Sequence, residues 1–298
     1  MVEEKRNIYI LMASFVVTEM LALIFANNIL VSQIPIEQYQ PFGNENIVQA
    51  TANSGILILF VIAFTLFLIL ILKLKFHKFF KLIAIGMPIF FLFVFLTQQD
   101  VIVAQQIFKL SDAVANIVFF GIIAYTAALV YSIWKGITKV VVTGFILTSS
   151  LIGAYLAVSI SPPTLFILPI AFALYDIYAV FKGPLKALIK VAPLSPSVKG
   201  KGKGRRITES AIAANLHKQF GLMLARIGGF TIGAGDFTFY SMLVAAAFVV
   251  KGLVAAFAVG VAINVGVVVT LWILQKYKRP LPGLPIPITL GIVTMILV

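Results

Sequence analysis

The chain has 298 residues, of which 61% are hydrophobic and only 11% are charged. Soluble domains carry about 45–50% apolar and roughly 25% charged residues, so this composition excludes a soluble globular protein and predicts a polytopic membrane protein. The net charge of +13 would suit nucleic-acid binding, but no nucleic-acid motif accompanies it, and a basic cytoplasmic side explains the excess. Without cysteine, disulfides, thiol catalysis and thiolate metal sites are excluded.

Nine apolar runs follow one another, most of them close to the ~20 residues that a helix needs to cross a bilayer. They are Ile8–Val31, Gly55–Leu72, Leu82–Leu96, Ala113–Trp134, Val140–Ser159, Pro162–Phe181, Ile232–Val250, Leu253–Leu274 and Leu284–Val298. The third run is short, and the sequence leaves open whether it continues past Asp100. The predicted fold class is an all-α polytopic membrane protein with nine transmembrane helices.

One long polar connection divides the spans into six and three. Residues 1–181 form the expected N-terminal part with spans one to six, and residues 228–298 form the C-terminal part with spans seven to nine. Residues 182–227 between them are expected to be a basic, flexible cytoplasmic loop, because their middle is rich in Gly, Pro, Ser and Lys.

Basic residues orient these spans. With a cytoplasmic N-terminus, 21 of the 23 Lys and Arg residues fall on the inner side, which leaves Lys109 and Lys251 outside. Cytoplasmic loops carry an excess of basic residues, so the N-terminus is predicted inside and the C-terminus outside.

Acidic residues within apolar runs are costly and mark functional sites. Asp176 lies six residues before Lys182, near the inner end of the sixth span, and Asp236 lies near the start of the seventh span, which rises from the same side. Because consecutive antiparallel helices are natural neighbours, we expect the two carboxyl groups to meet at a modest depth. Gly233 and Gly235 are expected to let another helix backbone approach closely.

Two neighbouring carboxyl groups in a medium of low dielectric cannot both ionise easily, so the pair is expected to hold one proton. That state suits peptide hydrolysis: the ionised member takes a proton from water as it attacks the carbonyl carbon, and the protonated member donates to the carbonyl oxygen. Either aspartate can fill either role. No metal or cofactor is expected.

Three other functions compete with an intramembrane endopeptidase. An ion channel or proton-coupled transporter would use the same aspartates to carry ions. A protease related to prepilin peptidases would cleave at the membrane surface, and a scaffold would leave two costly aspartates without a purpose.

Together, these motifs resemble those of the presenilin and signal peptide peptidase family of intramembrane aspartyl proteases. Tyr175-Asp176 matches the Tyr-Asp of the sixth helix, and Gly233-Ala234-Gly235-Asp236, followed by Phe237, matches the Gly-x-Gly-Asp motif of the seventh. Pro282-Gly283-Leu284, followed by Pro285, corresponds to the Pro-Ala-Leu motif before the ninth helix, with glycine in place of alanine.

The resemblance implies that Asp176 and Asp236 are catalytic, that Tyr175, Gly233, Gly235 and Phe237 support them, and that residues 282–285 bind substrate. The orientation is similar to that of presenilins, and the compact chain is similar to an archaeal presenilin homologue in the cell membrane of a prokaryote. Expected partners are transmembrane polypeptide substrates and membrane lipid, without obligatory accessory subunits. The sequence leaves open whether the chain forms a homo-oligomer.

Further polar and proline residues receive simpler interpretations. Glu19 in the first span is expected to pack as a neutral group, with a water path as the alternative, and Asn264 in the eighth is expected to donate an interhelical hydrogen bond. Tyr240 is interpreted as a packing aromatic. The stretch from Pro282 to Pro287 is expected not to form a regular helix. Its backbone, and that of residues 222–232, are candidates for pairing with an unwound substrate.

Overall fold

The computed structural model describes residues 2–32, 40–43, 46–181, 209–277 and 282–298. Its elements are α1 (Val2–Val31), α2 (Ile47–Lys73), α3 (His77–Asp100), the π-helix η1 (Val101–Ile107), α4 (Asp112–Lys135), α5 (Thr138–Ser159), α6 (Pro162–Phe181), α8 (Glu209–Phe220), β1 (Leu224–Ile227), β2 (Phe230–Gly233), α9 (Ala234–Lys251), α10 (Leu253–Tyr277) and α11 (Pro285–Leu297).

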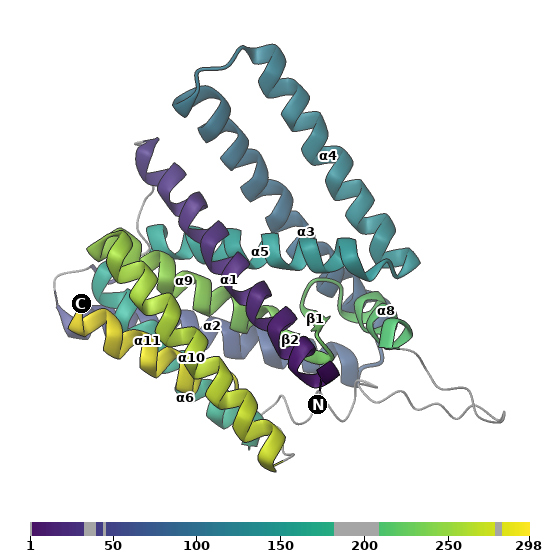
Figure 1. Ribbon diagram of the computed structural model, residues 1–298. Helices are drawn as coiled ribbons and strands as arrows, with labels where there is room; N and C mark the ends of the chain where they lie inside the picture. Colours follow the sequence, from purple (N-terminus) through teal and green to yellow (C-terminus); the bar gives the residue numbers. More distant parts are fainter. Residues whose placement is uncertain (1, 33–39, 44–45, 182–208, 278–281) are drawn as a thin grey trace.

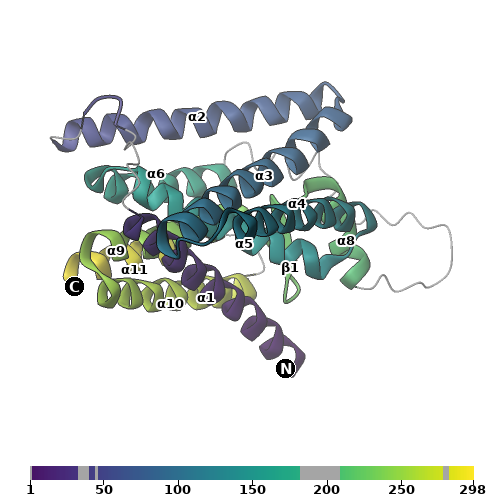
Figure 2. The ribbon, with the colours of Figure 1, turned by 90° about the horizontal axis from the view of Figure 1, so that it is seen from above.

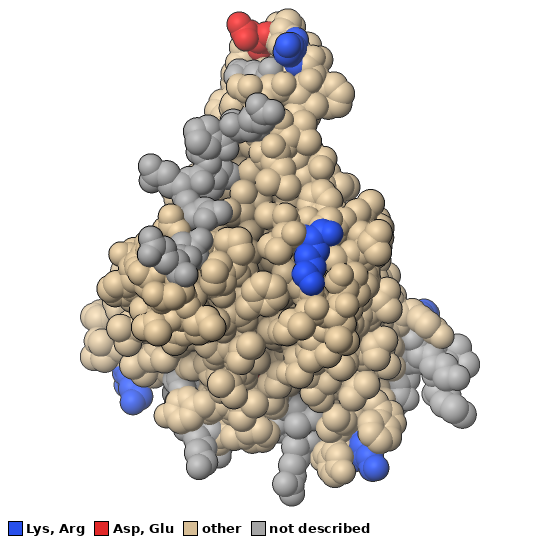
Figure 3. Space-filling view, turned by 90° about the vertical axis from the view of Figure 1, so that its left-hand side faces the viewer, with Lys and Arg blue, Asp and Glu red and all other residues tan. Residues whose placement is uncertain are grey.

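The described part of the chain is a polytopic membrane fold. Eight of its helices are long and apolar enough to cross a membrane, and α11 is a shorter apolar helix of 13 residues. Figure 3 shows a broad uncharged face, with charged side chains mostly toward its top and bottom. The count of nine spans and the orientation stay predictions.

The third span is longer than the sequence analysis predicted. Helix α3 begins before Leu82 and continues beyond Leu96 into η1. The polar side chain of Gln99 in this extension is hydrogen-bonded to α1. Asn28 Nδ2 donates to Gln99 Oε1 at 3.2 Å, and Gln99 Nε2 donates to the Phe25 carbonyl oxygen at 3.4 Å.

The prediction of a flexible loop over residues 182–227 is wrong for its second half. Residues 182–208 lie outside the described residues. Residues 209–220 form α8, whose Leu216 and Phe220 pack in a small apolar cluster with the facing ends of α2 and α3. The Phe220 ring meets Phe80 edge to face at 5.8 Å between centroids. The polar composition of the whole segment hid this short amphipathic helix.

A β-hairpin precedes α9. Strands β1 and β2 pair antiparallel, with Leu224 opposite Gly233, and Gly228 and Gly229 turn the chain at φ angles of 56° and 80°. Only glycine enters this left-handed region without a steric cost, so the Gly228–Gly229 pair fixes the turn. The hairpin delivers the chain directly to the first residue of α9.

Helix α9 is central in the bundle. It packs against α5, α1, α10, α11 and α6, and Figure 1 shows it among these elements. In the view from above, α2 lies beside α6 at one edge, and α1 and α10 lie at the other (Figure 2). The run Ala245–Ala247 is fully buried, which lets neighbouring helices approach closely.

Helix α5 approaches α9 very closely at Gly153. A methyl group at this position would lie 2.9 Å from the Met242 nitrogen and 3.0 Å from the Thr238 carbonyl oxygen, and it would overlap the Ser241 hydroxyl. Two of these atoms belong to the backbone of α9 and cannot move independently, so the spacing of the two helices depends on this glycine.

We therefore expect Gly153→Ala to lower the free energy of unfolding by about 1–3 kcal/mol through overpacking. Gly121→Ala on α4 is the matched control, because nothing lies within 4 Å of its added methyl group. The control should be neutral or stabilised by up to about 1 kcal/mol, since alanine is the better helix former. Thermal unfolding of both variants in one detergent checks this, and an equal effect of the two substitutions would contradict the packing.

A second prediction concerns pH. His217 in α8 is fully buried, and this burial lowers the pKa of its imidazole from 6.5, against an opposing effect of the backbone at Gly221 and Leu224. The folded chain therefore binds this proton less readily than the unfolded chain. Above pH 6.5 the imidazole is neutral in both states and contributes nothing, whereas stability is lost as pH falls below 6.5.

Amide protection of residues 209–227 should fall between about pH 7 and pH 5 in the wild type, and this fall should be absent in His217→Gln. The exposed His77 is the chain's other histidine, so His77→Gln is the control and should keep the fall. Hydrogen exchange corrected for intrinsic rates measures this. A fall that persists in His217→Gln would show that another group is responsible.

Candidate active site

Two helices and one connecting segment build the site. Asp236 lies in the first turn of α9, immediately after the hairpin, and Asp176 lies in the last two turns of α6. Both side chains are half-buried. Helix α11 packs against α6, α9 and α10, so the residues that precede α11 reach the space between the two aspartates.

Both carboxyl groups contact the same dipeptide. Asp176 Oδ2 accepts a hydrogen bond from the Leu284 backbone N–H at 3.0 Å. A methyl group added to Gly283 would lie 2.9 Å and 3.0 Å from the two carboxylate oxygens of Asp236. The two aspartates are close enough for their charges to interact. The structure thus brings Asp176 and Asp236 together at Gly283–Leu284.

Gly283 has a steric role at this point. Glycine stands here where the Pro-Ala-Leu motif has alanine, and the Asp236 carboxyl group occupies the room that the alanine methyl group would take. Glycine here permits direct contact between the Asp236 side chain and the backbone of the segment before α11.

Tyr240 was interpreted from the sequence as a packing or interface aromatic, and it does pack in the core beside Phe15, at 5.3 Å between ring centroids, but it also has a polar role. Its hydroxyl donates a hydrogen bond to the Gly283 carbonyl at 2.8 Å, so it fixes the same dipeptide from a third direction. Tyr240 follows Asp236 by four residues, and residues at this spacing lie on one face of a helix. That spacing is the signal that could have identified it.

A cavity of about 140 Å³ lies beside Asp236. A water molecule occupies about 30 Å³ in the liquid, so the cavity has room for several. Its wall includes Asp236, Tyr240, Gly283 and the β2 residues Phe230–Ile232, with α1 and α10 completing it. Water beside the Asp236 carboxyl group and a strand at the same wall are what hydrolysis of an extended peptide requires.

Gly233 and Gly235 do not serve the close helix packing that the sequence suggested. Among the described residues, a methyl group at Gly235 would meet nothing within 4 Å, and one at Gly233 would meet only the backbone nitrogen of Gly235, at 3.9 Å. Gly233 has an extended backbone that any residue adopts, with φ of −80° and ψ of 149°. Open space, rather than a neighbouring helix, lies beside both glycines.

Phe237 and Tyr175 lie in the core next to the aspartates. The buried Phe237 ring stacks on Phe15 of α1 at 4.1 Å between centroids and meets Phe145 of α5 edge to face at 5.0 Å. These contacts hold the first turn of α9 in place. Tyr175 packs half-buried against the same core, and its support of the aspartates stays a prediction.

The sequence predicted that the stretch from Pro282 to Pro287 would not form a regular helix, and this is wrong for its second half. Helix α11 begins at Pro285 and contains Pro287 in its first turn. Proline is accepted there because the first N–H groups of a helix have no partner within it. Pro282 is half-buried and Leu284 is buried, while their predicted contact with substrate is not tested by these positions.

Metal and cofactor binding were not expected from the sequence. In residues that the structure describes, no three or more His, Cys, Asp or Glu side chains gather as a metal site would require.

Comparisons with known proteins concern the fold and the C-terminal part of the chain. Residues 200–298 match the family model described as Presenilin, which covers Asp236 and residues 282–285 but not Asp176. The chain is 32% identical over 131 residues to Presenilin-B of Dictyostelium discoideum, 41% over 73 residues to Presenilin-like protein At2g29900 of Arabidopsis thaliana, and 42% over 65 residues to Presenilin homolog of Drosophila melanogaster.

These alignments are partial. They cover 43%, 24% and 22% of this chain, and 24%, 18% and 12% of the relatives, so the chain matches about a quarter or less of each relative's length. A solved structure described as a presenilin family intramembrane aspartate protease matches more broadly. It superimposes with a TM-score of 0.61 over 96% of both chains at 20% identity, and it therefore shows the fold. The chain thus has the fold of this presenilin family protease, and its C-terminal third matches the presenilin family model.

Proposed function

We propose that the chain is an intramembrane aspartyl endopeptidase that hydrolyses peptide bonds within transmembrane segments of other proteins. The observation that carries this proposal is the contact of both carboxyl groups with one backbone segment, Gly283–Leu284, at the edge of a cavity with room for water. The matched structure is that of an intramembrane aspartate protease, which supports the same activity.

The aspartate pair would work by general acid–base catalysis. One carboxylate takes a proton from water as the water oxygen bonds to the scissile carbonyl carbon, while the other carboxyl group protonates the carbonyl oxygen. Collapse of the tetrahedral intermediate then breaks the C–N bond, and the leaving nitrogen receives a proton from the pair. The roles belong to the pair as a unit rather than to either residue.

A substrate helix keeps its carbonyl groups hydrogen-bonded internally, so it must unwind before the pair can reach a peptide bond. Strand β2 lies in the wall of the cavity and pairs on one side with β1, in a two-stranded sheet. We propose that the unwound substrate adds as a strand near β2 and residues 282–285, which places its backbone beside Asp236. The open space at Gly233 and Gly235 supports this route.

The proposal also includes the membrane in which the protein lies and the partners that it needs. The protein is an integral multi-pass membrane protein, and we place it in the cell membrane of a prokaryote because its chain is compact and resembles an archaeal homologue. It would act without obligatory accessory subunits. A channel or transporter function is not favoured, since neither the family match nor the structural match points to it.

Cleavage of a transmembrane peptide by the purified chain tests this function. Asp176→Asn and Asp236→Asn should each lower turnover by about 10²–10⁴-fold, because each removes a proton-transfer group. The exposed Asp112 at the start of α4 gives the matched control, and Asp112→Asn should cleave like the wild type. Wild-type turnover in either active-site variant would contradict the proposed role of the aspartates. Failure of the purified wild type to cleave without added proteins would contradict the proposed independence from accessory subunits.

The open space beside Asp236 gives a separate prediction. Gly235→Leu should leave thermal stability unchanged or raise it by up to about 1 kcal/mol, because no described atom lies within 4 Å of its Cβ and leucine is the better helix former. The same variant should raise KM strongly, because the side chain would occupy the space that substrate needs.

Gly121→Leu on α4 is its control, since that position is equally open but lies on another helix. It should leave both stability and KM unchanged. Normal KM in Gly235→Leu would show that substrate does not pass beside this glycine.

A further inference from the structure

One peptide group connects the two helices that carry the aspartates. Its carbonyl oxygen, on Gly283, accepts a hydrogen bond from the Tyr240 hydroxyl of α9 at 2.8 Å. Its N–H, on Leu284, donates to Asp176 Oδ2 of α6 at 3.0 Å. The described residues contain no cis peptide bond, and in a trans peptide group the C=O and the N–H point in nearly opposite directions. A single planar unit is therefore held at both of its ends, once by each helix.

Asp176 depends on this unit for its contacts with the backbone. The Gly283 N–H acts on the same carboxyl group, so the two N–H groups that reach Asp176 lie on either side of the carbonyl group that Tyr240 holds. Helix α11 follows with prolines at its first and third positions, and proline has no N–H to offer in their place. Rotation of the peptide group would therefore take from Asp176 the donors that orient it.

Gly283 leaves this rotation unrestricted by any side chain. Glycine has access to a wider range of backbone angles than any other residue. A methyl group here would lie 2.9 Å from an Asp236 carboxylate oxygen, so alanine would not restrict the rotation without displacing that carboxyl group. The orientation of the peptide group consequently depends on its two hydrogen bonds, and the bond from Tyr240 is the one that is independent of the aspartates.

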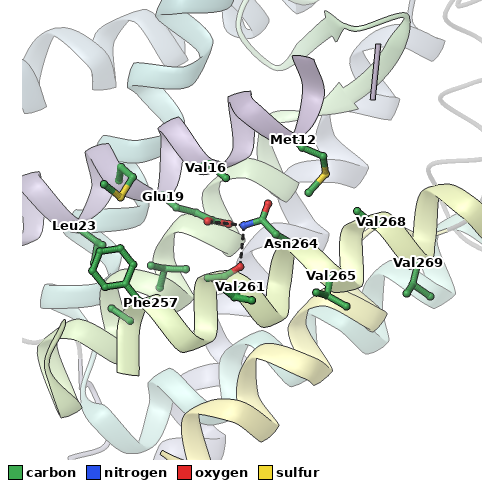
Figure 4. A pocket seen from close by; sticks show the side chains of 14 residues that line it. Met12, Val16, Glu19, Leu23, Phe257, Val261, Asn264, Val265, Val268 and Val269 are labelled. Atoms are coloured by element: carbon green, nitrogen blue, oxygen red, sulfur yellow. Dashed lines mark hydrogen bonds between the residues drawn. The ribbon is translucent and has the colours of Figure 1, made fainter. Parts of the chain in front are cut away.

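The ring of Tyr240 is itself firmly supported. It is only 3% exposed and lies 5.3 Å from the Phe15 ring of α1 between centroids. Glu19 follows Phe15 by four residues on the same face of α1, and it accepts a hydrogen bond from Asn264 Nδ2 of α10 at 2.8 Å (Figure 4). The expected interhelical hydrogen bond of Asn264 is thus confirmed, while the neutral state of Glu19 stays a prediction. Because this bond ties α1 to α10, the ring beside Tyr240 is held in place.

We propose that Tyr240 is a positioning residue of the active site, which orients Asp176 through the Gly283–Leu284 peptide group. The proposal rests on the peptidase function proposed above. Asp236 precedes Tyr240 by four residues, so α9 places one carboxyl group directly and the other through this tyrosine. The hydroxyl uses its hydrogen on the Gly283 carbonyl group, and it therefore acts on the geometry of the aspartate pair rather than on substrate.

Tyr240→Phe tests the proposal, because it removes the hydroxyl and keeps the ring. In protein labelled with 15N-leucine, the Leu284 N–H should exchange about tenfold faster than in the wild type, the factor that a hydrogen bond of ordinary strength contributes. The N–H of Leu243, fully buried on α9, should exchange as before.

Kinetics with a transmembrane peptide give the second measurement. In Tyr240→Phe, kcat should fall about 10–100-fold, since a displacement of ~1 Å in a reacting group can cost that much. KM should stay within about twofold of the wild type, as expected when the lost interaction acts only on the reaction step.

Two further variants isolate the hydrogen bond. Tyr125→Phe on α4 is the control, because the Tyr125 hydroxyl oxygen is buried without a partner among the described residues, and its loss should change neither Leu284 exchange nor kcat. p-Aminophenylalanine at position 240 keeps a donor and should restore both to within about threefold of the wild type. Thermal unfolding verifies that each variant is folded. If Tyr240→Phe does not fold, p-methylphenylalanine at position 240, with the size of tyrosine but no donor, takes its place.

Several results would overturn the proposal. Unchanged exchange of Leu284 in Tyr240→Phe would show that the hydroxyl does not hold the peptide group, and equal acceleration of Leu243 would show a general loosening of the fold. A normal kcat would show that the orientation does not matter for the reaction, and a raised KM with normal kcat would show that the hydroxyl contacts substrate. Failure of p-aminophenylalanine to restore both values would also contradict it. A wild type that does not cleave contradicts the proposed function instead, and Leu284 exchange then decides alone whether Tyr240 holds this peptide group.

Discussion

The site depends on one backbone segment held between two carboxyl groups. Asp176 binds the N–H of Leu284, Asp236 rests against Gly283, and Tyr240 binds the Gly283 carbonyl. Because three side chains from two helices contact one dipeptide, the start of α11 fixes how far apart the aspartates are. In the structure described here, this dipeptide occupies the position beside the carboxyl groups that a substrate backbone would have to approach.

Packing around the site is tight on one side and open on the other. At Gly153 the backbones of α5 and α9 nearly touch, and Phe237 is held by aromatic rings from α1 and α5, so the helix that carries Asp236 has little freedom. The side of Gly233 and Gly235 is open in the part of the chain that the structure describes, where no atom lies within 4 Å of a methyl group added to Gly235. A rigid support for the carboxyl group and free space next to it are both needed if a flexible peptide is to be cut at a defined bond.

The sequence predicted much of this arrangement, and its failures have physical reasons. The depth of Asp176 and Asp236 in consecutive antiparallel spans was enough to predict that they meet. The role of Gly235 was not predictable, because a pattern of small residues is the same whether a helix or open space lies beside it. Helix α8 was missed because a polar, glycine-rich stretch precedes it, whereas the i and i+4 spacing of Asp236 and Tyr240 was readable and was not used.

The central claim is that the carboxyl groups of Asp176 and Asp236 lie close together, both in contact with the Gly283–Leu284 backbone. The chain has no cysteine, so Asp176→Cys combined with Asp236→Cys gives a single reactive pair. A bifunctional thiol reagent that spans about 5 Å, close to two hydrogen-bond lengths, should link this pair rapidly in the membrane. Leu174→Cys with Asp236→Cys is the control, because Leu174 is 63% exposed on another face of α6. Rapid linking of the first pair and none of the second is predicted, and equal linking of both pairs, or failure of the first, would contradict the account.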